Sequence, residues 1–219
     1  MSSLLSGLPR AREAVSIAPG AVWLKNWLSL GEQIALVQRC RAFMDGPNGG
    51  YVPTVRGGGK MHIRMMCLGR HWNPLTYTYV SSRADHDNAP VAPVPGEWVA
   101  MASALANAAG FECRPDICLI NFYGSDGRMG LHQDKDESPS SIDAGHPVIS
   151  LSIGDTARFL FGGVRRRDRV EAMLLESGDA FVFGGAARLR YHGVSRIIAG
   201  TAPRELGLDG RFNLTFRQY

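Results

Sequence analysis

The residues with the clearest capacity for chemistry lie in the heptad LHQDKDE, which spans residues 131–137. His132 and Asp134 are two positions apart, so on an extended segment their side chains point to the same side. An imidazole and a carboxylate that converge can bind a divalent metal. A second imidazole would complete the two-histidine, one-carboxylate set of non-haem Fe(II) oxygenases. Because a His-x-Asp pair also occurs by chance in many chains, a metal site here needs support from other residues.

A second imidazole is available at His192, on a separate predicted strand further along the chain. Gly193 follows it and would allow a neighbouring backbone segment to approach closely. A single histidine on a strand is more often a packed or surface residue, so His192 alone does not establish a metal site.

Polar side chains on two predicted strands offer a binding site for a small dicarboxylate next to the metal. Four of them share one face of the strand by alternation: Arg211, Asn213, Thr215 and Arg217. A buried arginine needs an anionic partner, and its planar guanidinium matches a carboxylate bidentately. Asn121 and Tyr123 also share a face, at the end of the predicted strand 117–123. A dicarboxylate could therefore bind the metal at one end and these groups at the other.

The elements that must position these residues are mainly short strands. Eight are expected, with glycines between them, over residues 117–123, 129–133, 147–153, 158–161, 170–175, 180–183, 189–194 and 212–218. Their number and spacing predict a double-sheet jelly roll. Two helices are expected before them, over residues 30–43 and 97–109, and Ser29 with Glu32 forms a capping-box signature for the first. The fold class is thus mainly β with flanking helices (α+β).

Composition restricts the setting of the chain. Its 219 residues, of which 45% are hydrophobic, suit one domain (1–219), with residues 1–14 as a loose N-terminal lead-in. We find no secretory signal and no apolar run long enough to span a membrane, so a cytoplasmic location is expected. The four cysteines form no C-x-x-C pair and are expected as free thiols. The net charge of +4 permits a nucleic-acid partner without requiring one.

Two further segments have a recognisable character. Residues 51–86 interleave cations and aromatic rings, as single-stranded nucleic-acid surfaces do, although composition alone favours a solvated hairpin. Residues 138–146 are expected to form a surface loop, and residues 165–169, with sequence RRRDR, a charged turn.

Four motifs together resemble the AlkB family of Fe(II)/2-oxoglutarate-dependent nucleic-acid dealkylases: NFY at 121–123, LHQDKDE at 131–137, YHG at 191–193 and RFNLTFR at 211–217. The resemblance runs from about residue 15 and is densest from residue 115 onward. It is closest to the bacterial members. It implies a double-stranded β-helix (jelly-roll) catalytic core over residues 115–219, N-terminal helices, and a nucleotide-recognition lid over residues 51–86, in place of a plain hairpin.

The resemblance also implies roles for individual residues. The iron ligands would be His132, Asp134 and His192. The residues for 2-oxoglutarate would be Arg211 at its distal carboxylate, with Asn121 and Tyr123 assisting, and Asn213 and Arg217 at the end nearer the metal. The substrate contacts would be Asp136 at the exocyclic amine of the damaged base, Trp72 and His132 on either side of the flipped base, and Tyr77 and Arg166 nearby.

The implied activity is oxidative dealkylation repair of N-alkylated bases, such as 1-methyladenine and 3-methylcytosine. The co-substrates are 2-oxoglutarate and O2, and aldehyde, succinate and CO2 are released. Single-stranded DNA is the expected substrate, with RNA, or duplex DNA through base flipping, as further possibilities, and a monomer is expected. Three departures from the family bear on this expectation: a shorter spacing from Trp72 to Tyr77, a longer 138–146 segment, and Phe183 in place of a tryptophan. Alternatives are a 2-oxoglutarate oxygenase acting on RNA, protein or a small molecule, and a non-enzymatic nucleic-acid-binding module.

Overall fold

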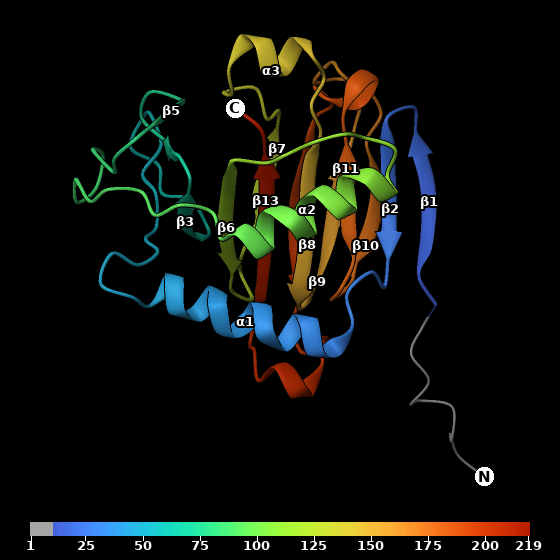
Figure 1. The fold of residues 1–219 in the computed structure, drawn as a ribbon, viewed down its shortest axis with the longest axis horizontal. Coiled ribbons are helices and arrows are strands. Elements are labelled where there is room, and N and C mark those ends of the chain that lie inside the picture. Colours follow the sequence, from blue (N-terminus) through green and yellow to red (C-terminus); the bar gives the residue numbers. More distant parts are fainter. Residues whose placement is uncertain (1–10) are drawn as a thin grey trace.

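The computed structural model describes residues 11–219, and two facing antiparallel sheets form its centre (Figure 1). In chain order the strands are β1 (Glu13–Ala18), β2 (Ala21–Lys25), β3 (Arg64–Leu68), β4 (His71–Asn73), β5 (Thr78–Val80), β6 (Ile117–Tyr123), β7 (Met129–His132), β8 (Val148–Gly154), β9 (Thr156–Phe161), β10 (Glu171–Leu175), β11 (Ala180–Phe183), β12 (His192–Ile198) and β13 (Arg211–Arg217). The large sheet has the order β1-β2-β11-β8-β13-β6-β3, and the small sheet the order β10-β9-β12-β7. Strands β4 and β5 form a separate hairpin.

The eight strands expected from the sequence are β6 to β13, four in each facing sheet, and they confirm the jelly-roll core. Strands β1 and β2 extend the large sheet on one edge, and β3 extends it on the other. The predicted strand 189–194 was wrong at its start. The segment before this strand forms a 3-10 helix, η1 (Gly185–Ala187), and a turn, so β12 begins only at His192.

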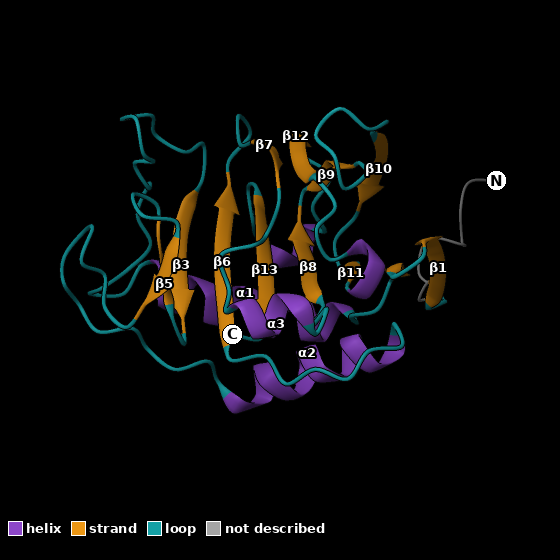
Figure 2. Ribbon diagram, turned by 90° about the horizontal axis from the view of Figure 1, so that it is seen from above, coloured by secondary structure: helices purple, strands orange, loops and turns teal. Residues whose placement is uncertain are grey.

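Two long helices cover the outer face of the large sheet, opposite the small sheet (Figures 1 and 2). Helix α1 (Leu30–Met44) has the predicted capping box, in which Ser29 Oγ accepts from Glu32 N and Glu32 Oε2 accepts from Ser29 N at 2.7 Å. Helix α2 (Gly96–Ala108) buries Trp98, whose ring meets the ring of Phe216 edge-on with centroids 6.4 Å apart. Both helices are confirmed to within two residues.

Alternation along β13 separates the two layers of the core. Phe212, Leu214 and Phe216 pack in the cluster that contains the residues buried by α1 and α2. The residues between them point to the opposite side, into the space between the two sheets, and every residue of β13 is buried. The period-two pattern therefore puts apolar side chains against the helices and polar ones inside the roll.

Two loop expectations need correction. Residues 138–146 are not all loop, because α3 (Pro139–Asp143) forms there, with Ser138 Oγ accepting from Ser141 N and proline at the first helical position. The lead-in expected over residues 1–14 is wrong at its end, since Glu13 already pairs with Lys25 in the β1–β2 ladder. Residues 1–10 of that lead-in lie outside the described residues.

The charged turn expected at residues 165–169 is confirmed. Residues 51–86 contain the short strands β3, β4 and β5. All four cysteines are free and buried. The remaining helix is η2 (Arg204–Leu206). None of the helices within residues 11–219 combines the length and the apolar character needed to cross a membrane.

Asp155 forms the corner at which the chain passes from β8 in the large sheet to β9 in the small one. Its buried carboxylate accepts hydrogen bonds from the backbone N–H groups of Thr201, Ala202 and Gly210 at 2.9, 2.9 and 3.1 Å. Gly210 directly precedes Arg211, so Asp155 fixes the point at which the polar face of β13 begins.

We therefore expect Asp155→Ala to leave three backbone donors without their acceptor and to lower the free energy of unfolding by about 3 kcal/mol. The thermal midpoint should fall by about 8 °C, measured by circular dichroism. Asp209→Ala, at an exposed position in the same loop region, is the matched control and should leave the midpoint within about 1 °C. Equal midpoints for the two variants would contradict a role for Asp155 at this corner.

Candidate active site

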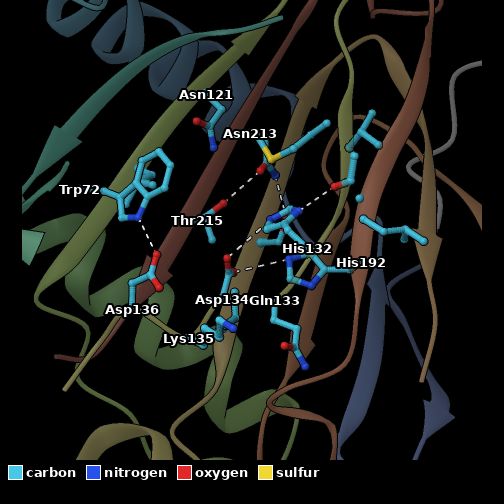
Figure 3. A pocket seen from close by; sticks show the side chains of 18 of the residues that line it. Trp72, Asn121, His132, Gln133, Asp134, Lys135, Asp136, His192, Asn213 and Thr215 are labelled. Carbon is cyan, nitrogen blue, oxygen red and sulfur yellow. Dashed lines mark hydrogen bonds and ion pairs between the residues drawn. The ribbon is translucent and has the colours of Figure 1, made fainter. Parts of the chain in front are cut away.

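A cavity of about 820 Å³ opens between the two sheets, and Trp72 of β4 is among the residues that line it (Figure 3). It is lined by every site residue predicted from the sequence: Trp72, Tyr77, Asn121, Tyr123, His132, Asp134, Asp136, Arg166, His192, Arg211, Asn213 and Arg217. The structure thus brings all twelve to one place, although the order of the chain separates them widely.

Two imidazoles and one carboxylate converge at one wall of this cavity. His132 ends β7 and His192 begins β12, and these two residues are directly opposed in the antiparallel ladder. The Nε2 atom of His132 lies 3.6 Å from Asp134 Oδ1, and that of His192 lies 3.5 Å from Asp134 Oδ2. The three potential ligand atoms lie within 4.8 Å of one another. This donor set matches the facial triad of non-haem Fe(II) sites.

Hydrogen bonds orient both rings toward Asp134. The Nδ1 atom of His132 lies 2.9 Å from the carbonyl oxygen of Gly130, and that of His192 lies 3.1 Å from the carbonyl oxygen of Arg190. Donation from each Nδ1–H leaves Nε2 as the atom that can bind a metal. Desolvation in the cavity and the nearby His192 ring lower the pKa of His132 to about 4, so its ring is in the neutral, metal-binding form at neutral pH.

A buried network of four charges holds the carboxylate in place. Arg217 Nη2 lies 2.6 Å from Asp134 Oδ2, and Arg217 Nε lies 3.1 Å from Glu137 Oε1. Arg188 Nη2 lies 2.8 Å from Glu137 Oε2, and Arg188 also donates to the carbonyl oxygen of Asp134. Burial alone would raise the pKa of Asp134, but Arg217 and His192 lower it well below the usual value. Asp134 is therefore an anion.

Arg211 differs from Arg217 because it forms no ion pair with any residue of the described range 11–219. Its guanidinium is 1% exposed, donates to Ser152 Oγ at 2.6 Å and to Leu175 O at 3.3 Å, and leaves Nε without a partner. Burial lowers the pKa of Arg211 to about 10, so it still carries its charge at neutral pH. An unpaired buried cation that lines the cavity is suited to bind a carboxylate ligand.

Neutral polar groups complete the same wall. Asn213 Nδ2 donates to Ser150 Oγ at 2.8 Å, and Thr215 Oγ1 donates to Asn213 Oδ1 at 3.0 Å. The buried Asn121 Oδ1 has no hydrogen-bond partner among the described residues. A cavity that presents unpaired Arg211 and Asn121 groups beside a His/Asp/His set fits a metal together with a dicarboxylate such as 2-oxoglutarate.

The opposite side of the cavity carries the aromatic residues. Trp72 Nε1 donates to Asp136 Oδ2 at 2.8 Å (Figure 3). The Trp72 and Tyr77 ring centroids lie 5.8 Å apart. Arg166 donates to the carbonyl oxygen of Leu131 at 2.9 Å and lies over the Tyr191 ring. The Trp72 and Tyr77 rings therefore contact each other despite their short sequence separation.

Sequence reasoning did not assign roles to Glu137, Arg188, Tyr79 or the two serines of β8. Ser150 and Ser152 could have been found, because they are the only polar residues in an otherwise apolar strand and share one face. Glu137 belongs to the heptad that was singled out, yet nothing local shows that it is buried. Tyr79 accepts from Arg217, and neither this contact nor that of Arg188 has a signal in the local sequence.

Comparisons with known proteins agree with this geometry. The sequence model of the 2OG-Fe(II) oxygenase superfamily matches residues 20–217. The DNA N(6)-methyladenine demethylase ALKBH1C of Arabidopsis thaliana is 44% identical over 224 residues, which is 93% of this chain and 49% of the relative. The alpha-ketoglutarate-dependent dioxygenase AlkB of Escherichia coli (strain K12) is 41% identical over 165 residues, 74% of each chain. The solved structure of OsALKBH1 has a TM-score of 0.89 at 40% identity and covers 94% of this chain and 100% of that chain. The chain spans about half the length of the Arabidopsis relatives it matches.

The close approach of β7 and β12 gives a test of the metal-binding arrangement. A Cβ at Gly193 would lie 2.6 Å from Met129 O and 2.9 Å from Gly130 O, whereas a Cβ at Gly130 would meet no atom within 4 Å. Gly193→Ala should push apart the strands that carry His132 and His192. We expect at least a tenfold loss of Fe(II) affinity, measured by anaerobic titration, and about 2 kcal/mol of lost stability.

Gly130→Ala is the matched control on the facing strand, since it adds the same methyl group in open space and keeps the carbonyl that orients His132. It should retain the metal affinity of the parent protein within about twofold. Unchanged affinity in Gly193→Ala would show that the spacing of the two strands does not set the site.

Proposed function

Because the chain belongs to the 2OG-Fe(II) oxygenase superfamily, and within it to the AlkB family, we propose that it removes alkyl groups oxidatively from nitrogen atoms of nucleic-acid bases, with DNA as the main substrate. The observation that carries this proposal is the composition of the cavity between the two sheets. One wall has a His/Asp/His set beside an unpaired arginine, and the other has a tryptophan bonded to a carboxylate.

The cofactor set is that of the superfamily: Fe(II), 2-oxoglutarate and O2. Together they supply oxidation of an N-alkyl C–H bond to a C–OH bond, coupled to conversion of 2-oxoglutarate to succinate and CO2. The resulting N–C–OH group breaks its N–C bond: the nitrogen keeps the electron pair, the hydroxyl loses its proton and an aldehyde leaves. In a cationic adduct the proton goes to solvent and the base becomes neutral, whereas in a neutral adduct the nitrogen takes the proton up. In this proposal His132, Asp134 and His192 hold the iron.

The remaining cavity residues divide between co-substrate and base. Arg211, assisted by Tyr123 and Asn121, binds the distal carboxylate of 2-oxoglutarate, while Asn213 and Arg217 meet the end nearer the metal. The position of Arg217 against Asp134 supports this, because it places that guanidinium beside the metal set.

On the substrate side, Trp72 and His132 enclose the extruded base and Asp136 accepts from its exocyclic amine, with Tyr77 and Arg166 at the cavity mouth. The target must be single-stranded or flipped out of a duplex, because its alkyl group is otherwise inside the base stack. The exposed arginines of the 165–169 turn favour phosphate contacts next to the site.

The branch of the family bears on the adduct. The sequence motifs predict a closest relationship to bacterial AlkB, and that relationship implies repair of cationic adducts such as 1-methyladenine and 3-methylcytosine. ALKBH1C of Arabidopsis matches 93% of the chain at 44% identity, whereas the Escherichia coli protein matches 74% of it at 41% identity. This difference favours the ALKBH1 branch and makes N6-methyladenine in DNA the second candidate substrate. The preference for single strands, activity on RNA, a monomeric state and a cytoplasmic location stay predictions from the sequence.

The proposal predicts that the protein releases succinate and repaired base in equal amounts. We expect both products when Fe(II), 2-oxoglutarate and O2 are supplied with single-stranded oligonucleotides that carry 3-methylcytosine, 1-methyladenine or N6-methyladenine. His132→Ala should abolish both products, whereas His146→Ala, which does not line the cavity, should keep them. Succinate without base repair on any oligonucleotide would point to a protein or small-molecule substrate, and full activity of His132→Ala would exclude the metal assignment.

A second prediction concerns the charge of Asp136. Asp136→Asn keeps the shape of the side chain and removes its charge, so it should lower kcat/KM for the cationic 3-methylcytosine by about tenfold, which corresponds to about 1.4 kcal/mol. The neutral 1-methylguanine, which also has an exocyclic amine, should lose less than about threefold. Equal losses of kcat/KM on the 3-methylcytosine and 1-methylguanine oligonucleotides would exclude charge recognition by Asp136.

A further inference from the structure

Asp136 is electrostatically different from the two other acids of its segment. Asp134 pairs with Arg217, and Glu137 pairs with Arg188 and Arg217. Asp136 forms no ion pair with any residue in the range 11–219 that the structure describes, although it lines the same cavity. Its negative charge is therefore left without a protein cation and is available to a ligand.

The only hydrogen bond that Asp136 accepts among these residues comes from Trp72. The indole Nε1–H donates to Oδ2 at 2.8 Å and leaves Oδ1 without a protein donor (Figure 3). An indole is a neutral donor with a single N–H, so it can fix the rotamer of a carboxylate without neutralising it. A lysine or arginine in the same place would orient the carboxylate and also cancel its charge.

Trp72 is itself held by the lid. It lies in β4 next to His71, whose Nε2 lies 2.5 Å from Asp85 Oδ1, and Tyr51 donates to Asp85 Oδ2 at 2.6 Å. Tyr77, the last residue of the hairpin turn, has a φ of +58° and packs its ring against Trp72. The contacts of His71 hold the backbone next to Trp72, and Tyr77 packs against the indole ring. Together they fix the direction of the indole N–H bond.

We propose that Trp72 is a specificity-determining residue whose indole N–H aims the unpaired Asp136 carboxylate at the base, so that one side chain supplies both the stacking surface and the orientation of the charge. This inference rests on the proposed function, since it assumes an extruded base in the cavity. It assigns to Trp72 a selective role beyond stacking, which any aromatic ring could provide.

The test separates the N–H group from the ring. Trp72→Phe keeps an aromatic ring, and β-(3-benzothienyl)alanine at position 72 keeps the indole shape but replaces N–H by sulfur. We expect both proteins to show a ratio of kcat/KM for 3-methylcytosine over 1-methylguanine that is lower by about tenfold. Binding of the same two oligonucleotides, measured by fluorescence anisotropy with Fe(II) and 2-oxoglutarate under anaerobic conditions, should show the same shift in the ratio of Kd values.

The chain contains a matched control, because Trp23 Nε1 donates to Asp179 Oδ2 at 3.0 Å and neither residue lines the cavity. Trp23→Phe removes the same kind of bond and should leave the ratio within about twofold. In an Asp136→Ala background, Trp72→Phe should no longer change the ratio, because the residue acts through that carboxylate.

The outcomes distinguish this inference from the proposed function. Absence of turnover on every methylated oligonucleotide in the parent protein would overturn the proposed function and this inference with it. Turnover with an unchanged ratio in the benzothienyl protein would overturn the inference alone. A ratio that falls equally with and without Asp136 would also overturn it, because Trp72 would then act by stacking.

Discussion

The ion pair between Arg217 and Asp134 is the interaction on which the rest of the site depends. Burying a charge is costly unless an opposite charge compensates it, and here two acids and two arginines compensate one another. The network joins the last residue of β13 to the segment that follows β7, and Arg188 connects that segment to the approach to β12. Loss of Arg217 would leave Asp134 without an arginine, and loss of Glu137 would leave Arg188 without a carboxylate. The geometry of the carboxylate in the His/Asp/His set therefore depends on the packing of three distant segments.

Within the cavity, charges with protein partners hold the structure, and charges without them mark where ligands are expected. Arg217 and Arg211 lie on the same face of one strand, yet the first is fully paired and the second forms no ion pair with a described residue. Asp136 is the corresponding unpaired anion on the aromatic side. The two unsatisfied charges have opposite signs, which suits an anionic co-substrate and a cationic or amine-bearing base in one cavity.

Much of this arrangement could be predicted from the sequence because a strand has a period of two. That period placed Arg211 and Arg217 on one face of their strand, and β6 to β13 agree with the eight strands expected from the short β-prone runs. The pairing of Glu137 with Arg188 could not be predicted, since it depends on how two loops meet across the roll. The start of β12 and the helix α3 were not predicted because local hydrogen bonds decided the structure there. A 3-10 helix and a turn precede β12, so that it begins only at His192, and the Ser138 cap begins a helix where a loop was expected.

Both imidazoles of the metal set come from a single ladder, because His132 and His192 are opposed residues of neighbouring strands in the small sheet. A slip of one residue in that pairing would turn one ring to the other side of the sheet. The donor set therefore exists in only one register, and a bound divalent ion would act as a cross-link that favours this register over its neighbours. Metal binding at this set would therefore contribute to the stability of the small sheet as well as to the chemistry of the cavity.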